Sequence, residues 1–227
     1  MPSTIEKPLG HLQRHIEELK ASLALPAYES AAGKQSQILG HFLSRALQMS
    51  EASNLICRAK LGTPLFVLTR VLCEDLFLCQ WVSLSENNAA EYSSAVISGG
   101  AKMIGVLLRK DRGQIVDRST REVKTDEFMP HLDNFKADRV HIEQLAGRLV
   151  LSKVYDLVYR PFSMEVHGKV FGLPSTSEQE PLYAALSAIV SLVKSIGLIA
   201  DNRVLRNQTT KPDEILHVLR LDQIAGK

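Results

Sequence analysis

Apolar residues recur at steps of three and four along nearly the whole chain, which is the spacing of one face of an α-helix. The pattern predicts a first amphipathic helix that ends near Pro26, and a second that begins near Ile38 and runs towards Cys57. No strand-like alternation persists beyond a few residues. The sequence therefore predicts an all-α fold, a helical bundle of long antiparallel helices with short accessory helices.

The segment from Thr63 to about Ser85 is apolar on most of its circumference, so we expect it to be a central helix of the bundle. Thr63-Pro64 is a typical helix start, because threonine can cap the first turn and proline suits the first helical position. Three charged residues interrupt this apolar helix: Arg70, Glu74 and Asp75. Arg70 and Glu74 lie four residues apart and can pair on one helix face.

The chain of 227 residues, 45% of them hydrophobic, is long enough to bury a substantial core. We expect an N-terminal amphipathic helix and linker at 1–34, a main bundle at 35–205 and a short C-terminal helix at 206–227. Within the bundle, Gly99-Gly100 should weaken a helix expected from Ala89 to about Leu108. The polar stretch 109–124 is expected to be a long surface connection.

The formal net charge of +2 means that any nucleic-acid binding must depend on a local basic patch. Three cysteines, without a CxxC pair, indicate buried free thiols and a cytoplasmic location. The apolar stretch Leu182–Ala200 approaches the length of a membrane span. It contains three serines and Lys194, so we expect a buried bundle helix and no membrane span.

A second set of polar residues lies near the C-terminal third, within YDLVYRPFSMEVHG at 155–168. Four of its residues follow each other at four-residue steps and would form one polar stripe on a continuous helix: Tyr155, Tyr159, Ser163 and His167. Pro161 should kink that helix at Arg160 or begin a new one. Arg160 and His167 would lie about two turns apart on roughly the same side.

Two interpretations of these residues remain open. In one, Arg160 and His167 act on a nucleic acid, with Arg70, Glu74, Tyr155, Tyr159 and Ser163 as supporting polar groups. In the other, the same residues form a buried polar cluster that holds helices together. No histidine, cysteine or carboxylate spacing indicates a metal site, no cofactor is expected, and the pair His11/His15 is interpreted as incidental.

The combination of Arg70 and Glu74 before Trp81, Tyr92 in the next helix, and then YDLVYRPFSMEVHG resembles a family of uncharacterised bacterial all-α proteins. That family is filed as a domain of unknown function and is similar to the HEPN group (higher eukaryotes and prokaryotes nucleotide-binding domains). The resemblance covers roughly residues 35–200. It implies a helical bundle that is often dimeric. Many HEPN proteins are metal-independent ribonucleases of toxin–antitoxin and phage-defence systems.

The HEPN motif is an arginine, four to six residues, and then a histidine, and Arg160-x6-His167 has this form. The resemblance implies that the arginine holds an RNA phosphate and that the histidine moves a proton of the ribose 2′-hydroxyl. Whether the chain is an enzyme stays open. We expect a non-catalytic HEPN-like subunit that binds a partner or senses a signal in bacterial defence or stress, with a metal-independent ribonuclease or toxin as the alternative. The expected partners are a second copy of the chain, an RNA or another protein.

Overall fold

The computed structural model describes residues 5–29, 33–110, 113–133, 141–166 and 179–223. These residues are helical apart from turns and one isolated antiparallel bridge between Val116 and Val123, so the predicted all-α class is confirmed. The chain divides into two compact units. The first comprises residues 1–86 and 141–227, and the second comprises residues 87–140.

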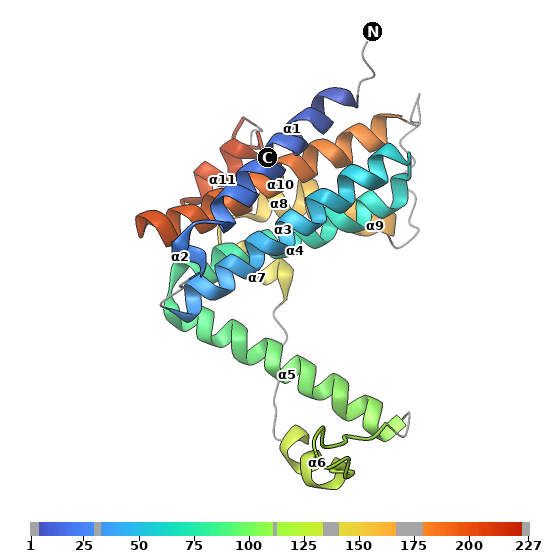
Figure 1. Ribbon diagram of the computed structural model, residues 1–227. Helices are drawn as coiled ribbons and strands as arrows, with labels where there is room; N and C mark the ends of the chain where they lie inside the picture. The colour runs from blue at the N-terminus through green and yellow to red at the C-terminus, as the bar shows by residue number, and fades with distance from the viewer. Residues whose placement is uncertain (1–4, 30–32, 111–112, 134–140, 167–178, 224–227) are drawn as a thin grey trace. The chain divides into compact units, whose positions relative to one another are not determined.

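Four long helices form the body of the first unit: α1 (Glu6–Leu23), α3 (Lys34–Arg58), α4 (Gly62–Leu84) and α10 (Gln179–Arg206). Helix α10 packs against α1, α3 and α4, so segments far apart in the sequence lie side by side, as Figure 1 shows. The largest fully buried side chains come from all four helices and include Phe42, Phe77, Leu12 and Ile189. This shared core explains the three- and four-residue apolar spacing of each helix.

Helix α4 is the central helix that its composition predicts. It contacts α3 and α10, and it also packs against the short helices α7 (Ile142–Arg148), η1 (Tyr155–Tyr159) and α9 (Arg160–Val166). Because neighbours cover several sides of α4, a single apolar stripe would not be enough to bury it. The three cysteines are free and buried, as expected, and burial raises the thiol pKa of Cys73 and Cys79.

The remaining helices of the first unit are short: α2 (Pro26–Glu29), α8 (Ser152–Val154) and α11 (Pro212–Val218). Helix α11 begins with a proline, and the Glu214 carboxylate accepts a hydrogen bond from the backbone N–H of Lys211 at 2.7 Å. Helix α11 packs on α10. This contact places the residues that follow α11 beside the middle of α10.

Helix α10 is long and apolar enough to cross a membrane by length and composition. Half of its most apolar window is nevertheless buried inside the protein, against α1, α3 and α4. Its C-terminal end also carries polar contacts to the rest of the first unit. Arg203 Nε donates to the side chain of Gln35 at 2.8 Å, and the Asp201 carboxylate accepts from the Tyr28 hydroxyl at 2.8 Å. The packing is that of a core helix in a bundle.

The second unit contains the long helix α5 (Glu86–Lys110) and the short helix α6 (Thr125–Asp133). Gly99-Gly100 were expected to weaken this helix, but α5 is continuous through both glycines. The predicted surface connection begins only after Lys110, and a short hairpin-like turn closes it through the Val116–Val123 bridge. The Asp117 carboxylate accepts from the backbone N–H groups of Ser119 and Thr120, both at 2.8 Å, which lowers its pKa.

Candidate functional site

The guanidinium of Arg160 lies between two carboxylates. Its Nη1 is 3.2 Å from Asp156 Oδ1, one helical turn earlier, and its Nη2 is 3.6 Å from Glu143 Oε1 on α7. The Arg160 Cζ also lies 5.3 Å from the centroid of the Tyr155 ring. The arginine side chain is 53% exposed, so these contacts hold it at the surface of the first unit.

Tyr159 connects this surface group to α4. Its ring stacks on that of Tyr155 with centroids 5.1 Å apart, and its hydroxyl donates to Glu74 Oε1 at 3.0 Å. Arg70 Nε donates to the same oxygen at 3.2 Å, which confirms the predicted Arg70–Glu74 pair. The Arg70 Cζ lies 5.8 Å from the Tyr159 ring. Four of the predicted supporting residues therefore belong to one connected polar cluster: Arg70, Glu74, Tyr155 and Tyr159.

The effect of Pro161 on the helix is seen in the turn before it. Residues Tyr155–Tyr159 form a π-helical turn, and α9 begins at Arg160 with Pro161 at its second position. Proline cannot donate to the carbonyl of residue 157, and its ring would clash with that carbonyl in a regular α-helix. A widened turn relieves this clash, and α9 follows the π-turn directly. The π-turn also contains both stacked tyrosines of the polar cluster.

The structure describes three of the four residues of the predicted polar stripe: Tyr155, Tyr159 and Ser163. Ser163 lies on α9 and is partly exposed, and the adjacent Phe162 packs on Phe66 of α4 with ring centroids 5.8 Å apart. His167 lies outside the described residues, so the arrangement of the candidate pair Arg160 and His167 stays a prediction. The partners of Arg160 were missed by sequence reasoning. Asp156 could have been found from its four-residue spacing, but Glu143 approaches from a separate helix.

Replacing Tyr159 with Phe is expected to lower the free energy of unfolding by about 1 kcal/mol, because Glu74 loses a partly buried hydrogen bond. Burial raises the pKa of Tyr159, so the phenol is protonated at neutral pH and donates this bond. Urea unfolding measures the change. Tyr155→Phe is the matched control: its hydroxyl is 3.5 Å from an exposed Glu143, and no loss is expected. Equal losses of unfolding free energy in both variants would show that the Tyr159–Glu74 hydrogen bond is not the source of the stabilisation.

A second charged pair lies deeper, between α3 and α4. Arg45 Nε donates to Asp75 Oδ2 at 3.0 Å, and the side chain of Asp75 is only 6% exposed whereas that of Arg45 is 37% exposed. Burial raises the pKa of Asp75 above its ordinary value, although Arg45 opposes this shift. The pair accounts for the third charge that interrupts the apolar sequence of α4, and it gives that charge a structural role.

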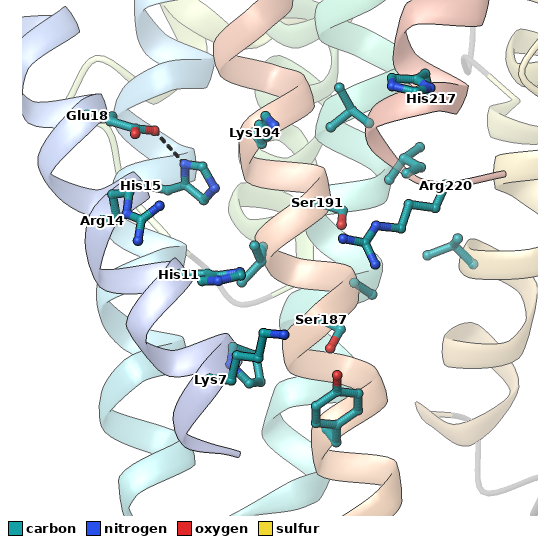
Figure 2. A pocket seen from close by; sticks show the side chains of 17 residues that line it. Lys7, His11, Arg14, His15, Glu18, Ser187, Ser191, Lys194, His217 and Arg220 are labelled. Atoms are coloured by element: carbon teal, nitrogen blue, oxygen red, sulfur yellow. Dashed lines mark hydrogen bonds and ion pairs between the residues drawn. The ribbon is translucent and has the colours of Figure 1, made fainter. Parts of the chain in front are cut away.

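A cleft of about 850 Å³ lies on another part of the first unit, among α1, α10 and the end of α11. Figure 2 shows α10 as its floor, with the labelled side chains of α1 on one side and Arg220 reaching over from the other. Seven of its described lining residues have basic side chains. They are Lys7, His11, Arg14, His15, Lys194, His217 and Arg220. Sequence reasoning missed this cleft and interpreted His11 and His15 as incidental. Among the described residues, no group of three or more histidine, cysteine or acidic side chains is placed to hold a metal ion.

Comparison with known proteins gives a family and no function. No curated protein and no solved structure matches the chain. One family model does match, over residues 36–180, and it is described as a family of unknown function (DUF5677). The matched region runs from α3 through the polar cluster to the first residues of α10. Since the match covers more than half of the sequence, the chain belongs to the DUF5677 family.

Proposed function

We propose that this chain is a non-catalytic, HEPN-like helical module that acts in the cytoplasm, in a bacterial defence or stress system, by binding a partner. The observation that carries the non-catalytic part is the environment of Arg160. Two carboxylates and an aromatic ring occupy its guanidinium, and a guanidinium that is already paired is poorly placed to hold an RNA phosphate. The adjoining residues Arg70, Glu74 and Tyr159 satisfy one another across two helices, as in a cluster that fixes packing.

The surface of α5 supports the partner-binding part. Three large apolar residues at heptad-like spacing are strongly exposed: Ile97 (55%), Ile104 (42%) and Leu107 (47%). Gly100 completes the seam, and a Cβ built there or at Gly99 would meet nothing within 4 Å. The seam is therefore open at its middle, where another helix can approach closely. Exposed apolar surface of this kind marks protein-interaction sites.

The charges of α5 indicate which partner fits. Acidic residues occupy its N-terminal half, at Glu86 and Glu91, and basic residues its C-terminal half, at Lys102, Arg109 and Lys110. A second copy of α5 packed antiparallel would place each acidic half against the basic half of the other copy, with the two glycines near the crossing point. The proposed partner is thus a second copy of the chain, joined through α5.

The alternative function is a metal-independent ribonuclease or toxin that uses Arg160 and His167. The observation that favours it is the π-helical turn immediately before Arg160, because such turns occur frequently at functional sites. Under this alternative, Arg160 would exchange a carboxylate for an RNA phosphate when substrate binds.

RNA cleavage in EDTA by the purified protein distinguishes the two functions. Arg160→Ala, His167→Ala and the control Arg148→Ala, which removes an exposed arginine of α7, are assayed beside the wild type, and their melting temperatures are recorded. The proposal expects no cleavage by any of the four proteins. Cleavage by the wild type and the control, lost in both candidate variants while all four melt alike, would establish the ribonuclease.

A further inference from the structure

The cleft among α1, α10 and the end of α11 combines a strong positive charge with the size of a ligand site. Four of its lining residues are permanent cations: Lys7, Arg14, Lys194 and Arg220. Among the described residues of the lining, Glu18 is the only acidic one. Its volume of about 850 Å³ lies within the usual range for small-molecule sites, roughly 300–1,000 Å³.

These cations are brought together by the fold. Lys7 and Arg14 lie seven residues apart on α1 and so share one face of that helix. Lys194 lies on α10, more than 170 residues later in the chain, and Arg220 follows the end of α11. Figure 2 shows these labelled side chains around the same cleft. Convergence from three helices separates this arrangement from a run of charge along one solvated helix.

The cations lack ionic partners within the described part of the chain. None of Lys7, Arg14, Lys194 and Arg220 forms a salt bridge there, whereas other surface charges of the first unit do, such as Lys20 with Glu51 at 3.2 Å. The carboxylate of Glu18 is already bound to His15 Nδ1, at 2.5 Å, and does not neutralise them. Four like charges around one cleft repel each other, and an anion bound among them removes that repulsion.

The floor of the cleft adds neutral hydrogen-bond donors. Ser187 and Ser191 lie one turn apart on α10, both line the cleft, and both are partly exposed to it. Serine hydroxyls and basic side chains together are the usual donors to phosphate oxygens. Charge spread over three helices suits a ligand with several phosphate groups better than a single small anion. The limited volume of the cleft suits a small molecule better than a nucleic-acid strand, which needs a long groove.

We propose that this cleft binds a small ligand that carries two or more phosphate groups, held by Arg14, Lys194 and Arg220 with the hydroxyls of α10. The described lining contains no residue of the polar cluster around Arg160 and none of α5. The site therefore adds a ligand to the proposed module, and it stands whether or not the chain dimerises or cuts RNA.

Calorimetric titration at fixed ionic strength tests the proposal, with inorganic tripolyphosphate, ATP and AMP as probes. Tripolyphosphate and ATP are expected to bind, and AMP at least about tenfold more weakly, because each charge-assisted hydrogen bond contributes about a factor of ten. Arg14→Gln, Lys194→Gln and Arg220→Gln should each weaken tripolyphosphate binding by about tenfold or more. The control Arg148→Gln removes one exposed positive charge from α7, outside the lining, and should leave the affinity unchanged.

Glu18→Gln gives a result that misfolding cannot imitate. This variant removes the one carboxylate among the described lining residues, so tripolyphosphate should bind several-fold more tightly. Absence of tripolyphosphate and ATP binding at millimolar concentration overturns the proposal. Equal weakening by Arg148→Gln also overturns it, because the binding would then depend on overall charge alone. A short RNA that binds more tightly than ATP, and loses affinity in the same three variants, would replace the small ligand with a nucleic acid.

Discussion

Arg45→Met is expected to destabilise the first unit by about 2–3 kcal/mol at neutral pH, because it leaves the buried carboxylate of Asp75 without its partner. The expected loss lies at the lower end of the range for breaking buried pairs, because Arg45 itself is partly exposed and keeps some contact with water. Methionine retains much of the length and packing of the arginine stem, so the loss reports on the charge.

The pH dependence of this loss separates an unpaired charge from lost packing. Burial raises the pKa of Asp75 in the folded protein, and removal of Arg45 raises it further. Between the unfolded and folded pKa values the folded state binds the proton and the unfolded state does not, so stability falls as pH rises through this window. The deficit of Arg45→Met should therefore be largest at neutral pH and shrink as pH falls towards about 4.

Urea unfolding of four proteins measures the effect: the wild type, Arg45→Met, Asp75→Asn and the double variant. His41 and Glu74 also act on the Asp75 carboxylate, and the double-mutant cycle cancels their own titration. The double variant should recover to within about 1 kcal/mol of the wild type, because a neutral pair needs no compensation. A deficit that is the same at every pH would assign the loss to packing.

The sequence predicted those parts of the fold that depend on local pattern. Apolar periodicity identified the long helices, and the all-round apolar character of α4 identified its central place. Gly99-Gly100 was misinterpreted because helix propensity is a small term, about 1 kcal/mol per glycine, and the rest of α5 outweighs it. The division into two units could not be predicted, because it depends on which helices pack together.

The same limit applies to the sites. The Arg70–Glu74 pair was predictable because its spacing alone places both groups on one helix face. The contact of Tyr159 with Glu74 joins residues 85 positions apart, and the basic cleft joins α1 to the end of α11. A histidine pair that looks incidental on one helix becomes part of a charged lining only when another helix lies opposite. Such sites arise from tertiary packing, which no spacing within one segment reveals.

The antiparallel α5 pairing predicts a large change in oligomeric state. The wild type should be a dimer by light scattering at micromolar concentration, and Ile97→Glu/Ile104→Glu should weaken dimerisation by at least about a hundredfold. Burial of each isoleucine contributes about 1.5–3 kcal/mol, and each introduced carboxylate would lose its hydration in the interface. Leu55→Glu is the matched control, since Leu55 lies on α3 and is 70% exposed, and it should leave the dimer intact.

The charge pattern of α5 allows a test of orientation as well as of association. Glu91→Lys should weaken the dimer moderately: Glu91 lies off the apolar seam, but the substitution adds positive charge to the half of α5 that pairs with the basic half of the opposite copy. Adding Lys110→Glu restores opposite charges in an antiparallel pair, so the double variant should regain much of the lost affinity. In a parallel pair Glu91 would face Glu91 and the second substitution would restore nothing. A wild type that remains monomeric up to about 100 μM would contradict the dimer itself, since that concentration corresponds to only about 5.5 kcal/mol of association free energy.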